Sequence, residues 1–300
     1  MAYHLKCDEV PAAGLRRMAR EQLQSALHEI AGANRAEIPA AVHATRKHIK
    51  KARALLRLVR DELGKEVFKE ENRRLRDVAR SFSSSRDACV RLQVLERLRD
   101  PIGNEGADFS QTRSILEKQL EAHGGGLSSE RREAEAILLG MCDRIEGWPL
   151  DELKMEDLCC ALRKTYQRGR KCFGYALSDP KPEDFHSLRK RVKELWYQVR
   201  ILQQLNRLVL CELLTEARTL AQHLGDLHDI TSFHEWLERT HDLPEEEGVI
   251  LGGLICTRER ELEKIVLDLG ARFFAEKPGV FERRLLRYAR QWPARQPASP

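Results

Sequence analysis

The sequence predicts an all-α protein, and three observations lead to this prediction. Apolar residues recur at helical spacing along nearly the whole chain of 300 residues. Glycine and proline are few, at 18 and 11, and aromatic residues make up only 6% of the chain, a composition that argues against a β-sandwich or a collagen-like fibre. No segment shows the strict alternation of apolar and polar side chains that predicts a half-buried strand.

In the first half, proline and glycine residues mark the ends of the expected helices. Pro11 begins the first helix and Gly32 ends it, while Pro39 begins a second helix that runs to about Glu62. A loop is expected over 100–107, because this stretch contains one proline and two glycines. The helices predicted for this half are 11–32, 39–62, 66–82, 86–99, one that ends at residue 123, and 128–147.

In the second half, proline and glycine residues again mark the breaks between the expected helices. A turn is expected over 178–182, and separate helices are expected on either side of Gly225. The helices predicted for this half are 151–177, 183–206, 211–224, 226–239, 247–269 and 278–292. The last residues of the chain are expected to be frayed.

An internal repeat relates the two halves. The segment HATRKHIK that begins at His43 aligns with the segment HSLRKRVK that begins at His186, at an offset of 143 residues (186 − 43). Further pairs at this offset, or within one residue of it, are Arg20 with Arg163, Arg57 with Arg200, and Arg86 with His228. We therefore expect a duplication, with helical bundles at residues 1–149 and 150–300 that are related by a pseudo-twofold axis.

Each repeat contains a long helix with a basic face. A turn of ~100° per residue places the cationic side chains that follow His43 and His186 on one side and apolar side chains on the other. Val42–Arg60 contains seven Lys or Arg residues and no acid, and the matching segment 186–204 contains five, opposed by Glu194 alone. Because a solvated helix normally interleaves charges of both signs, these faces predict a polyanionic ligand rather than a face that is merely solvated.

The length of the basic faces favours a long phosphate chain. About 15 residues of helix span ~22 Å, far more than one phosphate needs. The sequence has no Walker loop and no GxGxxG motif to hold a nucleotide. On the two faces only Trp196 and Tyr197 offer aromatic rings on which bases could stack.

Several segments resemble the CHAD family, the conserved histidine α-helical domain. They are the paired motifs at His43 and His186, the segment YQRGR that begins at Tyr166, and the segment LGDLHD that begins at Leu224, with its counterpart at Arg86-Asp87. The resemblance covers nearly the whole chain. It implies two antiparallel four-helix bundles with pseudo-twofold symmetry and a basic central channel that binds inorganic polyphosphate without catalysis. It also implies association with polyphosphate granules.

The resemblance and the repeat together define an expected polyphosphate-binding set. Its members are Arg20, His43, Arg46, Lys47, Lys50, Lys51, Arg53, Arg57, Arg86, Arg163, Arg170, His186, Arg189, Lys190, Lys193, Tyr197, Arg200 and His228. No catalytic residue is expected among them.

No metal or other cofactor is expected. Lys47 and Lys190 stand at i+4 from His43 and His186, where a helical metal site would need a ligand. The eight cysteines form no CxxC pair and are expected to be reduced thiols. The sequence shows no secretory signal and no membrane span, so we expect a cytoplasmic protein.

Three alternatives remain open from the residues alone. His228-Asp229, with His223, Asp226 and His186 elsewhere in the chain, suggests a metal-dependent phosphohydrolase of the His-Asp type. The basic faces are also compatible with a general nucleic-acid binder, or with a helical scaffold for an acidic protein partner.

Overall fold

The computed structural model describes residues 2–32, 38–82, 84–99, 109–123, 128–240 and 243–292, and these parts contain helices and turns but no strand. The all-α prediction is therefore confirmed. The loop expected over 100–107 lies outside the described residues. None of the helices in the described parts combines the length and the apolar character needed to cross a membrane.

Helices in the first half have bounds within a few residues of those predicted. They are α1 (Pro11–Ala31), α2 (Ile38–Leu58), α3 (Arg60–Leu63), α4 (Lys65–Ser81), α5 (Ser84–Leu98), α6 (Ser110–His123), α7 (Ser128–Arg144) and the 3-10 helix η1 (Ile145–Gly147). Those of the second half are α8 (Met155–Ser178), α9 (Pro182–Leu202), the 3-10 helix η2 (Gln203–Leu205), α10 (Arg207–Arg239), α11 (Glu245–Phe273) and α12 (Pro278–Ala289).

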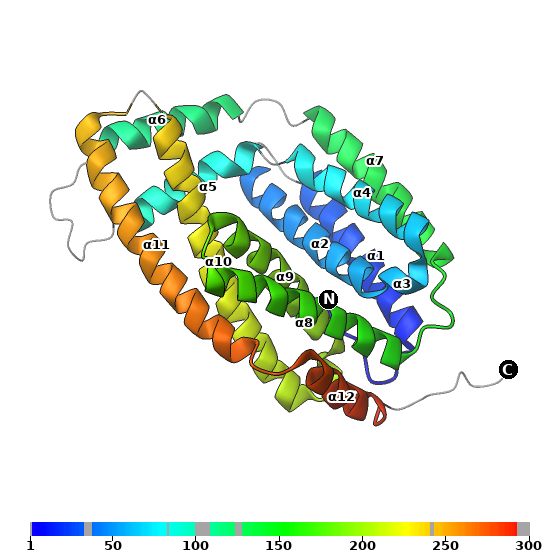
Figure 1. The fold of residues 1–300 in the computed structure, drawn as a ribbon. Helices are drawn as coiled ribbons and strands as arrows, with labels where there is room; N and C mark the ends of the chain where they lie inside the picture. Colours follow the sequence, from blue (N-terminus) through cyan, green and yellow to red (C-terminus); the bar gives the residue numbers. More distant parts are fainter. Residues whose placement is uncertain are drawn as a thin grey trace.

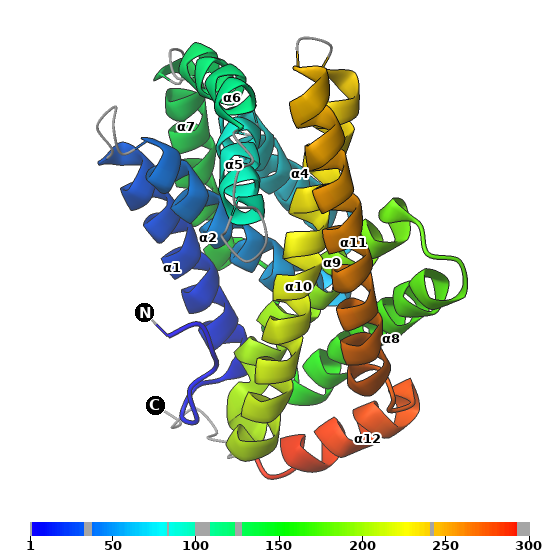
Figure 2. The same cartoon turned by 90° about the vertical axis from the view of Figure 1, so that its left-hand side faces the viewer.

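Two groups of helices pack against each other along the middle of the molecule (Figure 1, Figure 2). In the first group α1 packs on α2 and α7, and α4 packs on α2 and α7. In the second group α9 packs between α8 and α10, α11 lies along α10, and α12 crosses the end of α8. The two groups meet where α2 contacts α9, and α5 reaches from the first half to contact both α2 and α10.

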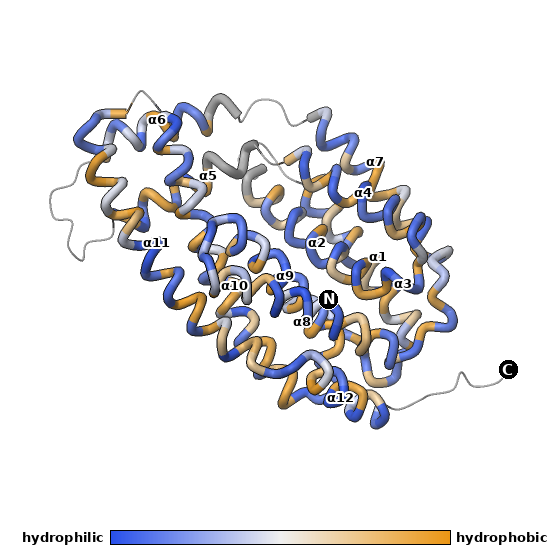
Figure 3. Tube along the Cα trace, viewed as in Figure 1, coloured by the Kyte–Doolittle hydropathy of each residue, from blue (hydrophilic) through white to orange (hydrophobic). Residues whose placement is uncertain are grey.

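Each helix buries the apolar face that the sequence pattern indicated. Hydrophilic and hydrophobic residues succeed one another along the coloured helices, as expected for helices with one polar and one apolar face (Figure 3). On α2 the buried side includes Ile49, Leu55 and Leu56, all with no exposed surface, and on α9 it includes Leu195 and Val199. Burial of these side chains fixes how α2 and α9 are rotated, so their cationic side chains point away from the two bundle cores.

One predicted boundary is wrong: Gly225 does not separate two helices. It lies inside α10, a single helix that begins at Arg207 and runs to Arg239. The side chain of Asn206 caps its start by accepting a hydrogen bond from the Val209 backbone N–H. A glycine within a helix costs about 1 kcal/mol, and burial of the neighbouring Leu224 and Leu227 against the core outweighs that cost.

Candidate functional site

The candidate site lies around the contact between α2 and α9. At this contact the Gln198 side chain is fully buried and its Nε2 donates a hydrogen bond to the Ala54 carbonyl oxygen at 3.0 Å. Ala54 and Tyr197 are also buried here, and they hold equivalent positions in the repeat, since 197 − 54 is 143. The cationic residues of both helices flank this packed centre.

On one flank, Lys51 lies close to Arg200. Burial, together with the positive charges of Arg200 and Lys47, lowers the pKa of Lys51 to about 8. The ammonium Nζ lies 5.6 Å from the centre of the Tyr3 ring, a distance suited to a cation–π contact. The Tyr3 hydroxyl donates to the Lys51 carbonyl oxygen at 2.7 Å, so Tyr3 holds both the backbone and the charge of this residue.

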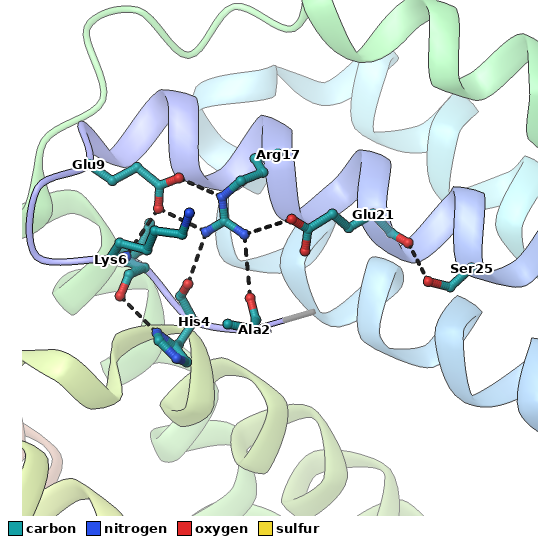
Figure 4. A network of polar contacts seen from close by, with 8 residues as sticks. Ala2, His4, Lys6, Glu9, Arg17, Glu21 and Ser25 are labelled. Carbon is teal, nitrogen blue, oxygen red and sulfur yellow. Dashed lines mark hydrogen bonds and ion pairs between the residues drawn. The ribbon is translucent and has the colours of Figure 1, made fainter.

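The N-terminal segment that carries Tyr3 is held in place by Arg17 of α1 (Figure 4). Arg17 forms a two-pronged ion pair with Glu9, at 2.5 and 2.8 Å, and a further pair with Glu21 at 3.1 Å. Its guanidinium also donates to the carbonyl oxygens of Ala2 and His4. Burial tends to raise the pKa of Glu9, but the hydrogen bonds from Arg17 and the Lys6 backbone, together with the charges of both residues, lower that pKa overall.

On the other flank, the buried carboxylate of Glu194 interacts with several arginines. Its side chain is 3% exposed and pairs with Arg191 at 2.7 Å and with Arg168 of α8 at 3.5 Å. Arg57 of α2 is near enough to feel its charge: burial lowers the pKa of Arg57, Glu194 raises it, and Arg191 and Arg168 lower it again. One carboxylate therefore faces three guanidinium groups, which leaves an excess of positive charge.

Helix α4 adds cations that the sequence patterns did not single out. Arg53 of α2 donates to the Asn72 side chain of α4 at 3.1 Å. Burial and the charges of Arg57, Arg76 and Arg80 lower its pKa to about 10, against an opposing effect of Glu194. Arg46 also reaches α4, where it donates to the Ala79 carbonyl oxygen. The sequence of α4 contains both acids and bases. Its pattern therefore does not predict that basic residues of this helix lie near α2, and only the packing of the two helices shows it.

A histidine pair lies between α9 and α10. Nδ1 of His186 and Nδ1 of His228 are 3.3 Å apart, with ring centres separated by 4.5 Å. At such a contact one nitrogen carries the proton and the other accepts it. Burial lowers the pKa of His186, and the charges of Lys190 and Arg189 lower it further. A bound polyanion would act in the opposite direction and favour the protonated form.

Beside this pair is a cavity of about 540 Å³ between α5, α9 and α10. Three arginines line it, one from each helix: Arg91, Arg189 and Arg239. Its remaining lining residues are Val90, His228, Asp229, Ser232, Glu235 and Trp236. Arg91 and Arg239 were absent from the expected set, because neither belongs to the repeated motif, and only the approach of α5 to α10 brings them to Arg189.

Most of the expected binding residues lie on α2 and α9, with varied exposure. His43, Lys47 and Lys190 are exposed and Tyr197 is buried, while the others are half-buried. The half-buried members on these two helices are Arg46, Lys50, Lys51, Arg53, Arg57, His186, Arg189, Lys193 and Arg200, and His228 on α10 is half-buried as well. The side chain of Arg86 lies outside the described residues.

Three arginines of the expected set lie on other helices, and their contacts are not with residues of the α2–α9 contact. Arg20 is paired with Glu146 in η1, and Arg163 approaches Glu282 of α12 at 3.5 Å. Arg170 donates to the Phe274 carbonyl oxygen at 2.9 Å. These arginines therefore connect helices within a bundle.

The segment YQRGR has a structural role that its sequence did not reveal. The Tyr166 hydroxyl lies within hydrogen-bond distance of the carbonyl oxygens of Phe273 (3.2 Å) and Glu276 (3.0 Å). Gly169 makes room for the Phe274 ring, which a Cβ at this position would approach to 2.9 Å. Together with Arg170, these residues fasten the turn between α11 and α12 to α8.

The fold and these residues define an all-helical protein in which cations gather where two long helices meet. A family model described as the CHAD domain matches residues 17–238, and the chain belongs to this family. The structure is similar to the crystal structure of the CHAD domain from the plant Ricinus communis, with a TM-score of 0.71 and 14% sequence identity over 92% of this chain and 96% of that chain. At this identity the likeness concerns the fold alone. No curated protein matches the sequence.

Proposed function

We propose that the protein binds inorganic polyphosphate at the cations of α2 and α9, and that this binding involves no catalysis. The CHAD family is associated with polyphosphate binding. The observation that carries the proposal for this chain is the clustering of positive charge: three arginines share Glu194, and Lys51 lies against Arg200. Such mutual repulsion is relieved when a polyanion replaces the missing counter-charge.

The chemistry of the site suits a chain of phosphates. Arg46, Arg53 and Arg189 offer planar groups that can donate two hydrogen bonds to a phosphate, whereas Lys50 and Lys193 offer compact charges. The basic face of α2 continues onto Arg76 and Arg80 of α4, and that of α9 continues into the arginine-lined cavity. A ligand with a charge on every repeating unit can contact several of these groups at once. In this proposal Arg20, Arg163 and Arg170 support the bundles and are left outside the site.

A charge-removal variant tests the proposal. We expect the variant R46Q/K50Q/R189Q/K193Q to bind medium-chain polyphosphate about 100-fold more weakly than wild type, or worse, because four charge-assisted contacts are lost. The matched control is R132Q/R218Q/K264Q/K277Q, which removes the same formal charge from exposed positions on other faces. Isothermal titration calorimetry at fixed salt measures both, and circular dichroism checks folding.

Two outcomes would contradict the proposal. Equal loss of binding in the control variant would show that binding depends on the net charge of the protein and not on the cations of α2 and α9. Equal competition by duplex DNA, per phosphate, would show a general nucleic-acid binder instead. Displacement of DNA by polyphosphate, with no displacement in the reverse direction, is the expected result.

A further inference from the structure

A cluster of potential metal ligands lies between α10 and α11, and it contains none of the expected polyphosphate-binding residues. His234 comes from α10, while Cys256 and Glu259 stand three residues apart on α11 and so share one face of that helix. A nitrogen, a sulfur and a carboxylate oxygen from these three side chains all lie within 4.8 Å of one another.

The geometry is close to that of a zinc site. Zinc–ligand bonds of about 2.0–2.3 Å in a tetrahedron place the ligand atoms roughly 3.3–3.8 Å apart. His234 Nδ1 and Glu259 Oε2 are separated by 3.1 Å. The Cys256 Sγ lies within 4.8 Å of both atoms, at most about 1 Å beyond the upper end of this range.

The outer contacts of these side chains also match a metal site. Thr231 donates its hydroxyl hydrogen to Glu259 Oε1 at 2.9 Å, which orients the carboxylate so that Oε2 faces His234. The second imidazole nitrogen of His234, Nε2, lies 4.0 Å from the Glu238 carboxylate one helical turn further along α10. In metal sites a carboxylate that accepts a hydrogen bond from the distal nitrogen of a ligating histidine fixes the imidazole tautomer, and Glu238 is placed to make this bond after a small side-chain movement.

The surroundings favour a cation. Glu259 also lines a cavity of about 460 Å³, whose charged lining residues are Glu183, Glu235 and Glu263 besides Glu259, and a single lysine, Lys190. Glu263 stands one helical turn beyond Glu259 on α11, so these two acids share one face of the helix. The cavity provides a route by which an ion can reach Glu259.

We propose that His234 Nδ1, Cys256 Sγ and Glu259 Oε2 bind one divalent ion of the zinc class, with a water molecule as the fourth ligand. The mixed nitrogen, sulfur and oxygen set suits Zn²⁺, and the thiolate disfavours Mg²⁺ and Ca²⁺. On binding, the thiol releases its proton to solvent. The ion links α10 to α11 and thereby stabilises the fold whenever it is present.

Cobalt substitution tests this site directly. Chelator-stripped, fully reduced protein is titrated with Co²⁺, and we expect one ion per chain with a thiolate-to-cobalt charge-transfer band and the strong visible bands of tetrahedral Co²⁺. Zn²⁺ should then displace the cobalt and abolish the bands. Absence of the bands in folded wild-type protein would overturn the proposal.

Variants decide whether these residues hold the ion. C256S should lose the charge-transfer band, and H234Q and E259Q should each weaken Co²⁺ binding by at least 10-fold. T231V, which removes only an outer contact, should weaken it by about 10-fold. The controls are C172S, at a half-buried cysteine of α8, and H28Q, at an exposed histidine of α1; both should bind as wild type does. Retention of the band in C256S, or its equal loss in C172S, would place the ion elsewhere. If C256S fails to fold, H234Q and E259Q alone decide the question.

Discussion

Single side chains near the α2–α9 contact show how crowded positive charge shifts proton equilibria. Burial, together with the charges of Lys51 and Lys47, lowers the pKa of His48 to about 4. Nδ1 of His48 lies 2.9 Å from the Gln22 side-chain oxygen, and Gln22 itself is buried. His48 therefore stays neutral in the folded protein at pH values where an exposed histidine takes up a proton.

The first prediction concerns the effect of His48 on the pH dependence of stability. Its ordinary pKa is 6.5 and its folded pKa is about 4, so the unfolded chain binds more protons between these values. Its contribution to stability is fully present above pH 6.5 and is lost as the pH falls towards 4. We expect H48Q to flatten the decline of the unfolding free energy over this range, as measured by urea denaturation at a series of pH values. H28Q is the control, and an unchanged slope in H48Q would contradict the prediction.

At the scale of elements, the repeat positions that meet across the α2–α9 contact are not chemically equivalent. Lys51 and Glu194 occupy the same repeat position, since 194 − 51 is 143. Each lies near an arginine of the opposite helix, Lys51 near Arg200 and Glu194 near Arg57. The flank with Lys51 therefore lacks a carboxylate that the flank with Glu194 has, and we expect phosphate to bind more tightly beside Lys51.

The close packing of α8 on the end of α11 depends on a glycine. A Cβ at Gly169 would lie 2.9 Å from two atoms of the Phe274 ring, which is itself packed on Tyr166 and Phe173. Because the added methyl group would have to displace this ring from its packed position, we expect G169A to lower the unfolding free energy by about 1–3 kcal/mol. Thermal or urea unfolding measures the change.

Gly174 in the same helix provides the matched control for that prediction. A Cβ there would meet no atom within 4 Å among the described residues. G174A should therefore raise the unfolding free energy by about 0.5–1 kcal/mol through helix propensity. If G169A raises the unfolding free energy as G174A does, the close approach of Phe274 to Gly169 has no energetic consequence and the prediction is wrong.

At the scale of the whole molecule, contacts cross between the two repeats expected at 1–149 and 150–300. The Leu5 backbone N–H donates to the Ile201 carbonyl oxygen at 2.9 Å, and the Tyr3 ring meets Tyr197 edge-on with centres 6.2 Å apart. Arg97 of α5 pairs with Asp226 of α10 at 2.9 Å, and Arg91 lies over the Trp236 ring. The first half thus covers apolar surface of α9 and α10.

We therefore predict that the segment 150–300 expressed by itself is much less stable than the full chain. Removal of residues 1–149 exposes Tyr197 and Trp236, which are 6% and 8% exposed in the intact protein, and leaves α9 without its α2 partner. Circular dichroism should show a lower thermal midpoint and a broader transition, and addition of the separate 1–149 segment should restore stability. An isolated half that unfolds at the midpoint of the full chain would show two independent domains.

The sequence alone predicted the all-α class, nearly every helix and the basic faces of α2 and α9. It could do so because helical periodicity and charge imbalance are local patterns, which can be detected within a short segment of the chain. It failed at Gly225, where a local cost is outweighed by burial along α10, and it did not show that Arg170 donates to the carbonyl oxygen of Phe274.

Only the tertiary structure decided which cations lie together and which side chains form the cluster on α10 and α11. Arg76, Arg80, Arg91 and Arg239 join the basic region through packing between helices far apart in the sequence. His234 and Cys256 are separated by 22 residues (256 − 234), and neither carries a motif that marks it. Periodicity determines which face of a helix is buried, but the partner of that face, and so the groups that meet across it, depends on long-range packing.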